Sequence, residues 1–409
     1  MFPALSAATR GVPLLVSAQF VSGLADNALL LVAIAEVQAR GGPAWLPPLL
    51  KLVFTLAYVL LAPVVGPLAD RWPKARVMSV ANAVKAGACA AMALGVPVVP
   101  CFCVAGAGAA LYSPAKYGLM TELVPPHRLV AANGWIEVAT VVAILLGTLL
   151  GGTLVAWLAP GPSFAGLLAL YGLAALLNRG IPDSGARYPA PAPLRRQLGD
   201  FLADNARLWR DPLGRVSLAT TTLFWGVGAT LQFLVLRWAV ETLGLTLAQA
   251  AWLQGLSATG VVLGAAIAGR CIALERAPGV LWLGVPMGLL LLPMPQVHHW
   301  PLALPLLAGA GLVAGLFVVP MNALLQHRGA TLLSAGRSIA VQNFNENASV
   351  LLMLAGYAAC TAHAVPLDTL IRGFGLAVAL LMALIAASHH RRRRAPLPPD
   401  TPPAEETPA

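Results

Sequence analysis

The sequence has 409 residues, of which 58% are hydrophobic and 10% are charged, with a formal net charge of +10. A soluble domain typically carries about 25% charged residues, so most of this surface cannot face water. A β-barrel would show segments of about 10 residues in which polar and apolar side chains alternate. The apolar runs are instead long and uniform. They predict an all-α transmembrane protein, whose helices satisfy their own backbone hydrogen bonds.

Apolar segments follow one another along the whole chain. A helix needs about 20 mainly apolar residues to cross the hydrocarbon core of a bilayer. By this criterion, and with proline and glycine at the boundaries, the chain is predicted to contain about twelve spans. They fall roughly at 12–39, 47–69, 76–95, 98–119, 129–157, 162–180, 214–240, 247–273, 278–296, 301–326, 334–361 and 366–389.

Cationic residues gather in the loops that follow even-numbered spans, among them Arg71, Lys74, Arg128 and Arg276, and in the run 391–394. Such loops lie on the cytoplasmic side, beside anionic lipid headgroups. The pattern therefore predicts a multi-pass membrane protein with both termini in the cytoplasm. It also explains the positive charge without nucleic acid as a partner.

The spans divide the chain into four expected regions. Residues 1–181 form an N-terminal half of six helices, and residues 213–390 form a C-terminal half of six. Between them lies a cytoplasmic linker, 182–212, in which apolar residues at near-helical spacing over 194–210 predict an amphipathic helix on the membrane face. The Pro- and Glu-rich segment 391–409 is expected to be a disordered cytoplasmic tail.

The two halves contain an internal repeat. The run EVATVVAILLG at 137–147 shares Glu, Ala, Thr/Ser, Val and Gly in one register with ENASVLLMLAG at 346–356. A second pair is PAK at 114–116 in span four and PMN at 320–322 in span ten. Such parallel repeats predict two halves related by pseudo-two-fold symmetry, with the substrate site between them near mid-membrane.

The loop after span two reads GPLADRWPKAR at 66–76. It resembles the signature loop of the major facilitator superfamily, a Gly-x-x-x-Asp-Arg-x-Gly-Arg-Arg type motif, with Pro73 where that family often has glycine. Asp70 is then expected to pair with cations across the interface between the halves and to stabilise one conformation. The residues assigned to this conformational latch are Asp70, Arg71, Lys74 and Arg76. An ordinary solvated charge cluster is the alternative.

Six further stretches carry unusual polar residues. They are QFVSGLADNALL at 19–30, YSPAKYG at 112–118, ANGWIE at 132–137, LFWG at 223–226, VPMNALLQ at 319–326 and AVQNFNEN at 340–347. These stretches resemble the bacterial lysophospholipid transporter family of the major facilitator superfamily. The resemblance covers nearly all of the chain except the linker and the tail.

This resemblance implies a major facilitator fold and a secondary transporter that works by alternating access. The implied substrates are lysophospholipids, especially lysophosphatidylethanolamine, which move from the outer to the inner leaflet of the bacterial inner membrane. The implied functional partner is an acyltransferase joined to an acyl-carrier-protein synthetase, which restores the missing acyl chain. The residues alone indicate only a secondary transporter among membrane lipids.

Ionisable residues inside the spans are the candidate substrate contacts, because each costs about 2.5–3.5 kcal/mol at mid-bilayer on insertion scales. Asp26 lies about 14 residues into span one, roughly 21 Å along the helix axis, with Asn27 beside it. The substitution Asp26→Asn is predicted to abolish headgroup transport without loss of folding. The alternative is a structural hydrogen bond to a neighbouring helix.

A zwitterionic headgroup needs a carboxylate for its ammonium and cations or amides for its phosphate. Asp26 or Glu137 suits the first role, and Arg237, Lys116 or Lys85 suits the second. Lys116 has the alternative of binding carbonyls at its helix end. The candidate substrate-binding residues are Asp26, Asn27, Lys85, Lys116, Asn133, Glu137, Asn322, Gln342, Asn343 and Glu346.

Arg237 and Glu241 stand four residues apart near the outer end of span seven, the spacing of an ion pair on one helix face. An exposed pair of this kind contributes only about 0.3–0.5 kcal/mol. We therefore predict an external gate or a headgroup capture site here. A snorkelling interfacial pair is the alternative.

An ion-coupled drug or nutrient antiporter of the same superfamily is the nearest rival reading. The Gly-Pro motif usual in span five of drug antiporters is missing, and the glycines there more simply permit close helix packing. An intramembrane lipid acyltransferase would need a catalytic constellation, but the sequence has no His-x4-Asp pattern, so we expect no enzyme. The five cysteines lack metal-ligand spacing, and neither a metal nor another cofactor is expected.

Overall fold

The computed structural model describes residues 3–41, 46–189 and 193–394, and within these ranges the chain is helical without a β-strand. The helices before the linker are α1 (Pro3–Ala39), α2 (Leu46–Leu60), α3 (Ala62–Arg71), α4 (Lys74–Ala93), α5 (Val98–Leu123), α6 (Leu129–Trp157) and α7 (Pro160–Arg179). The linker helix is α8 (Leu194–Arg210). After it come α9 (Pro212–Glu241), α10 (Leu247–Cys271), α11 (Gly284–Leu289), α12 (Trp300–Leu332), α13 (Ala335–Ala362) and α14 (Leu367–Arg394). Three 3-10 segments are η1 (Pro126–Arg128), η2 (Leu274–Leu283) and η3 (Met294–Gln296).

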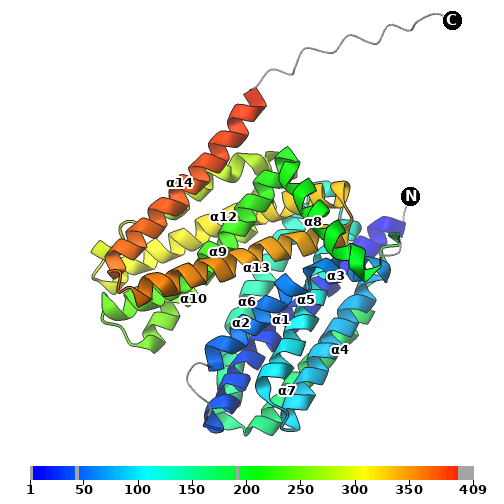
Figure 1. Cartoon of the computed structure of the whole chain (residues 1–409), viewed down its shortest axis with the longest axis horizontal. Coiled ribbons are helices and arrows are strands. Elements are labelled where there is room, and N and C mark those ends of the chain that lie inside the picture. Colours follow the sequence, from blue (N-terminus) through cyan, green and yellow to red (C-terminus); the bar gives the residue numbers. More distant parts are fainter. Residues whose placement is uncertain (1–2, 42–45, 190–192, 395–409) are drawn as a thin grey trace, which may run out of the picture.

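The helices form two bundles, α1–α7 and α9–α14, which converge around α3 and α8 and diverge toward their other ends (Figure 1). We name the converging side the linker end and the other side the far end. One apolar core at the linker end takes side chains from both bundles, for example Met78 and Leu119 from the first and Phe317 from the second. Two other cores each lie within a single bundle. The bundles therefore share their packing mainly at the linker end.

Nine described helical segments are long and apolar enough to cross a membrane, or ten when the bent pair α2 and α3 counts as one span. Two other long helices, α4 and α13, fall outside this set. They carry charged residues such as Lys85 in α4 and Glu346 in α13, which are expected to face protein rather than lipid. The chain is thus a multi-pass membrane protein, and the number of twelve spans stays a prediction.

Proline interrupts two of the predicted spans. The span at 47–69 bends by 64° between α2 and α3, and Pro63 stands in the first turn of α3. The span at 278–296 was expected to be one helix but consists of 3-10 turns around the six-residue α11. Pro278 and Pro286 remove backbone donors in this segment, which weakens a continuous α-helix and favours short 3-10 turns.

Glycines on α6 allow α1 to approach closely. A Cβ on Gly147 would lie 2.6 Å from the Leu24 carbonyl oxygen and 2.9 Å from Asn27 Cβ. A Cβ on Gly151 would likewise lie 2.9 Å from a carbonyl oxygen of α1, whereas one on Gly152 would meet no described atom within 4 Å. Gly147 and Gly151 therefore form the close helix contact that the sequence predicts, whereas Gly152 takes no part in it.

The substitution Gly147→Ala is expected to destabilise the protein by about 1–3 kcal/mol, the typical cost of overpacking a close-packed contact. The matched control is Gly152→Ala on the same helix, where alanine has open space and a better helix propensity than glycine. Thermal unfolding of both purified variants in one detergent measures the difference. Equal unfolding temperatures would contradict the packing role of Gly147.

The linker helix α8 has the predicted bounds and an amphipathic arrangement. Phe201 and Leu208 are buried against the bundles, whereas Leu202 is exposed. Arg337 Nε of α13 lies 2.7 Å from Asp204 Oδ2, which holds α8 to the second bundle. Because α8 is half-buried in protein, burial raises the pKa of the Asp204 carboxyl despite its arginine partner. Its contact with a membrane surface stays a prediction.

The predicted tail begins later than expected. Helix α14 continues through Arg394, because arginine is a good helix former and its charge is favourable at a helix C-terminus. The rest of the predicted tail, 395–409, lies outside the described residues.

Candidate functional site

A buried ion pair joins α1 to α4 inside the first bundle. The Lys85 ammonium lies 2.8 Å from Asp26 Oδ2 and 3.0 Å from Oδ1. The Tyr171 hydroxyl of α7 donates to Asp26 Oδ1 at 2.8 Å. Lys85 also donates to Ser22 Oγ, and this hydroxyl donates to Asn82 Oδ1. Three helices therefore fix the position of one carboxylate.

The two charges of this pair differ in exposure. The Lys85 side chain is 1% exposed, whereas 23% of the Asp26 side chain is accessible. A ligand that reaches the pair therefore contacts the carboxylate, with the ammonium behind it. The sequence assigned these residues to opposite parts of one headgroup, but in this conformation Lys85 neutralises Asp26.

Asn27 faces a different helix from Asp26, although the two are neighbours in the chain. Its Nδ2 donates to the Gly23 carbonyl of the same helix at 2.8 Å, and its Cβ packs against Gly147 of α6. Successive helical residues point about 100° apart, so the structure separates Asn27 from the ion pair that its neighbour forms.

A second charged group contains one cation and two carboxylates from three helices. Lys116 of α5, Glu137 of α6 and Glu346 of α13 are all buried. Lys116 interacts electrostatically with both glutamates, and these glutamates occupy matched positions of the internal repeat. Gln342 Nε2 donates to Glu346 Oε1 at 2.7 Å and to Asn322 Oδ1 at 3.1 Å. The structure therefore brings five of the predicted site residues into one polar layer.

Two other predicted residues bond across the interface between the bundles. Asn133 of α6 and Gln326 of α12 exchange two amide hydrogen bonds of 2.8 Å. Ser113 Oγ of α5 donates to Asn343 Oδ1 of α13 at 3.2 Å. In this conformation Asn133 and Asn343 thus hold the two bundles together, and a substrate would have to displace these bonds to bind there.

Asp70, near the end of α3, accepts hydrogen bonds from the start of α13. The donors are Ser334 Oγ, the Gly336 amide at 2.9 Å and the Arg337 amide at 3.2 Å. Ser334 is the N-cap residue of α13, but its side chain makes no capping bond. Asp70 therefore satisfies the free N–H groups of this helix from the other bundle. Lys74 Nζ adds a contact of 3.0 Å to Asp70 within the first bundle.

The backbones of α3 and α13 approach each other closely beside Asp70. A Cβ on Gly66 would lie 2.9 Å from Ala340 Cβ and 3.0 Å from Arg337 Cα. A Cβ on Gly336 would lie 2.7 Å from Asp70 Oδ1. Larger residues at these two glycines would therefore push the bundles apart at the linker end.

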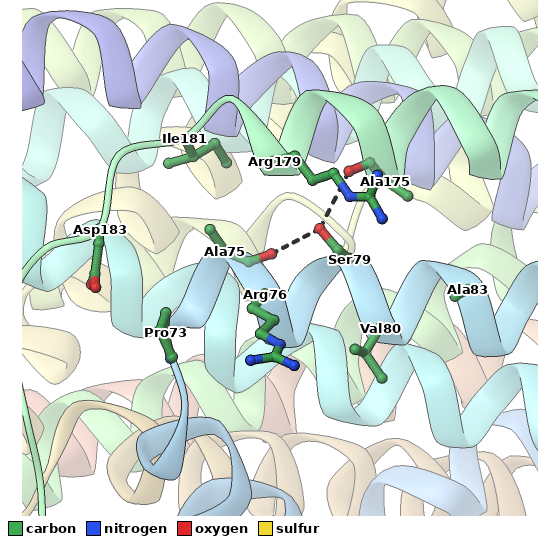
Figure 2. Close-up of a pocket in the computed structure, with 10 residues that line it drawn as sticks. All are labelled: Pro73, Ala75, Arg76, Ser79, Val80, Ala83, Ala175, Arg179, Ile181 and Asp183. Atoms are coloured by element: carbon green, nitrogen blue, oxygen red, sulfur yellow. Dashed lines mark hydrogen bonds between the residues drawn. The ribbon is translucent and has the colours of Figure 1, made fainter.

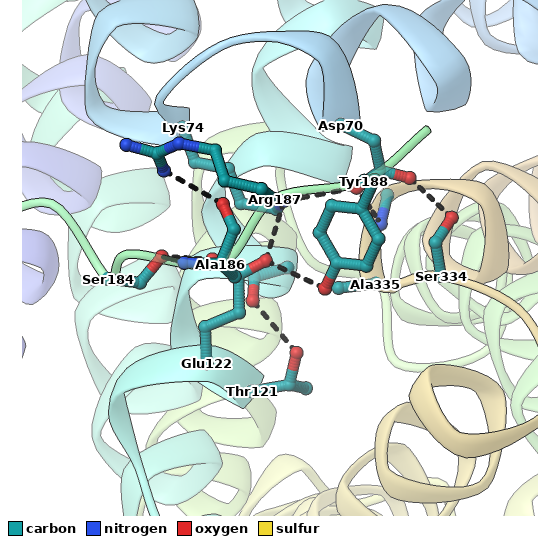
Figure 3. A network of polar contacts seen from close by, with 12 residues as sticks. Asp70, Lys74, Thr121, Glu122, Ser184, Ala186, Arg187, Tyr188, Ser334 and Ala335 are labelled. Atoms are coloured by element: carbon teal, nitrogen blue, oxygen red, sulfur yellow. Dashed lines mark hydrogen bonds and ion pairs between the residues drawn. The ribbon is translucent and has the colours of Figure 1, made fainter. Parts of the chain in front are cut away.

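Residues 184–188, which we name the strap, cross the linker end between α7 and α8 and bind the same network (Figure 3). Glu122 of α5 lies at the centre of this network, and its carboxylate is 2.7 Å from Lys74 Nζ. Ser184 Oγ and the Tyr188 hydroxyl donate to the two oxygens of Glu122 at 2.6 and 3.0 Å. Burial and the Glu122 carboxylate raise the pKa of Tyr188 above its usual range, so its hydroxyl keeps its proton and remains a donor.

The other two residues assigned to the latch lie outside this network. Arg71 is exposed and lies against the Trp72 ring, 6.0 Å from its centroid. Arg76 is also exposed, and it is one of the residues that line a groove beside α4 and α7 (Figure 2). Within the described residues neither arginine forms an ion pair. The structure therefore brings Asp70 and Lys74 together and leaves the two arginines apart.

The predicted ion pair of α9 is confirmed. Arg237 Nε lies 2.6 Å from Glu241 Oε1, and the two side chains are 28% and 49% exposed. The pair lies at the far end, where Glu241 is the last residue of α9 and Arg237 stands one turn before it. Its roles in gating or headgroup capture stay predictions.

The sequence profile of the Major Facilitator Superfamily matches residues 15–352. The lysophospholipid transporter LplT of Salmonella arizonae is 40% identical over 382 residues, which cover 93% of this chain and 96% of that protein. The LplT of Citrobacter koseri is 39% identical over 379 residues, with coverages of 92% and 95%. The chain belongs to the LplT family of the Major Facilitator Superfamily.

Solved transporters share the fold at much lower identity. A bacterial homologue of the iron transporter ferroportin, in an outward-facing state, has a TM-score of 0.73 at 15% identity, covering 94% of this chain and 100% of that one. The transporter FucP in the outward conformation has a TM-score of 0.67 at 17% identity, covering 95% and 100%. These similarities confirm the predicted major facilitator fold.

Several residues of the site were missed by sequence reasoning. Tyr171 lies in an apolar span, where a hydroxyl gives no pattern that marks it as a partner of Asp26. Ser22 and Gln326 lie in two of the unusual polar stretches, but nothing in their spacing assigns them to the site. Glu122 lies in the last turn of α5 and Tyr188 lies in the Pro-rich linker, and neither spacing nor charge pattern relates these two residues to each other. The contacts depend on helix packing, which the sequence does not encode locally.

Proposed function

We propose that this chain moves lysophospholipids, especially lysophosphatidylethanolamine, from the outer to the inner leaflet of the bacterial inner membrane. The observation that carries the proposal is the match of 39–40% identity to proteins named lysophospholipid transporters, over more than nine-tenths of the chain. The buried charges support it, because a zwitterionic headgroup needs both signs within one site.

The orientation follows from the positive loops. Arg76, Arg128, Arg276 and Arg328 all lie in or beside the loops at the linker end, and cationic loops favour the cytoplasm. We therefore place the linker end and both termini in the cytoplasm. The closed contacts of Asp70 then lie on the cytoplasmic side, which makes this a conformation closed toward the cytoplasm.

In this mechanism the substrate headgroup binds between the bundles. The accessible carboxylate of Asp26 accepts the ethanolamine ammonium, and Lys116 neutralises the phosphate. The single acyl chain needs no polar partner and trails between helices into the bilayer. Release to the inner leaflet then requires the Asp70 contacts and the amide pair of Asn133 to open while the far end closes. An acyltransferase joined to an acyl-carrier-protein synthetase would use the delivered lysolipid.

Reconstitution of the purified full chain into liposomes tests the proposal. With labelled lysophosphatidylethanolamine in the outer leaflet, the label is expected to reach the inner leaflet faster than in protein-free liposomes. Na⁺ and H⁺ gradients, applied separately, identify any coupling ion. Movement of an unrelated drug without movement of lysolipid would instead identify an antiporter, and formation of diacyl lipid by the purified chain would identify an acyltransferase.

A further inference from the structure

A groove of about 520 Å³ lies on the outside of the first bundle, between the first half of α4 and the end of α7 (Figure 2). This volume is within the range of small-molecule sites. Most residues that line the groove are apolar, among them Val80, Ala83, Ala175 and Ile181. Both helices lie on the side of the first bundle away from the second (Figure 1), so the groove is separate from the interface between the bundles.

Two arginines from facing helices stand at the mouth of the groove. Arg76 is in the first turn of α4 and Arg179 is in the last turn of α7. Both are exposed, and neither forms an ion pair within the described part of the chain. Asp183 is the one carboxylate among the described lining residues, and it is bound by Arg187 at 2.7 Å. The hydrogen bond from Arg187 lowers the pKa of Asp183, so this acid stays charged and paired. The positive charge of Arg76 and Arg179 is left uncompensated.

The groove lies at the depth of lipid headgroups. Arg179 ends an apolar segment, Gly161–Arg179, that is long enough to cross a membrane, so Val80, Ala83 and Ala175 lie on the hydrocarbon side of the arginines. Trp72 is exposed two residues before α4 begins, and tryptophan is enriched at the membrane interface. A molecule in this groove therefore has its polar end at the arginines and its apolar part in the bilayer.

We propose that this groove binds an anionic diacyl phospholipid from the leaflet at the linker end. The two guanidinium groups hold the lipid phosphate, which arginine binds through paired hydrogen bonds. One acyl chain lies along Val80, Ala83 and Ala175. A zwitterionic lipid is disfavoured, because its ammonium finds no free carboxylate at the mouth. Basic pockets between membrane helices are a known form of anionic lipid recognition.

Native mass spectrometry of the detergent-purified full chain, titrated with phosphatidylglycerol or phosphatidylethanolamine, tests this site. The wild-type chain is expected to retain phosphatidylglycerol preferentially. The double variant Arg76→Gln/Arg179→Gln is expected to bind it about tenfold more weakly. Ala83→Trp, which fills the groove and leaves both charges in place, is expected to weaken binding as well. Thermal unfolding confirms that each variant used is folded.

The matched control is the double variant Arg270→Gln/Arg276→Gln. It removes the same charge from exposed positions at the linker end of the second bundle. Phosphatidylglycerol binding is expected to stay at the wild-type level in this control. An equal loss in both double variants would overturn the proposal in favour of a general surface charge effect. Equal binding of the two lipids by the wild-type chain would also overturn it.

Discussion

The substitution Asp26→Asn is expected to abolish lysolipid transport and also to destabilise the protein by about 3–5 kcal/mol. The cause of the lost stability is Lys85, whose ammonium would stay 1% exposed without its carboxylate partner. Lys85→Met is expected to cost less stability, because the Asp26 carboxylate is 23% exposed and keeps its hydrogen bond from Tyr171. The ion pair thus changes the sequence-based expectation that neutralising Asp26 would leave folding intact.

The double variant Asp26→Asn/Lys85→Met separates the structural role from transport. Removing both charges of a buried pair is often nearly neutral for stability, so the double variant is expected to unfold close to the wild-type temperature. It is still expected to lack transport in liposomes, because no carboxylate remains for the ammonium of the substrate. Normal lysolipid movement by a stable double variant would show that Asp26 serves the fold alone.

Contacts within one helix were the ones that the sequence predicted best. The spacing of Arg237 and Glu241 on α9 predicted their ion pair, which the structure contains. The glycines of α6 predicted a close helix contact. Both predictions need only the helix period of 3.6 residues per turn, which follows from local sequence without knowledge of how the helices pack.

For contacts between helices, the sequence predicted which residues take part but not which residues pair. Asp26 and Lys85 were both identified as buried charges, but 59 residues separate them, and their pairing depends on how α1 packs on α4. The sequence therefore assigned them separate ligands. The same limit explains the latch, where Asp70 was expected to pair with cations across the interface between the halves, whereas the one cation that binds it among the described residues is Lys74 of the same bundle. The donors across the interface are instead a hydroxyl and backbone N–H groups at the start of α13, more than 260 residues away.

Asp70→Ala is expected to open the linker end. Asp70 accepts two backbone N–H groups and a hydroxyl from the start of α13, and hydrogen bonds to a charged group contribute about 1.5–3 kcal/mol each. Losing even one such bond shifts a two-state equilibrium about tenfold or more toward the open conformation. The favourable interaction of the carboxylate with the N-terminal end of the α13 dipole is lost as well.

His127 belongs to the first bundle and Thr331 to the second, and both are exposed at the linker end. Spin labels at these two residues measure the opening as the distance between the bundles. The labels are placed in a background without the five native cysteines. The matched control is Glu275→Ala, which removes an exposed carboxylate of η2 at the same end, outside the Asp70 network. The distance is expected to lengthen in Asp70→Ala and to stay at the wild-type value in the control. An unchanged distance in Asp70→Ala would mean that the strap and the amide pair of Asn133 suffice to keep this end closed.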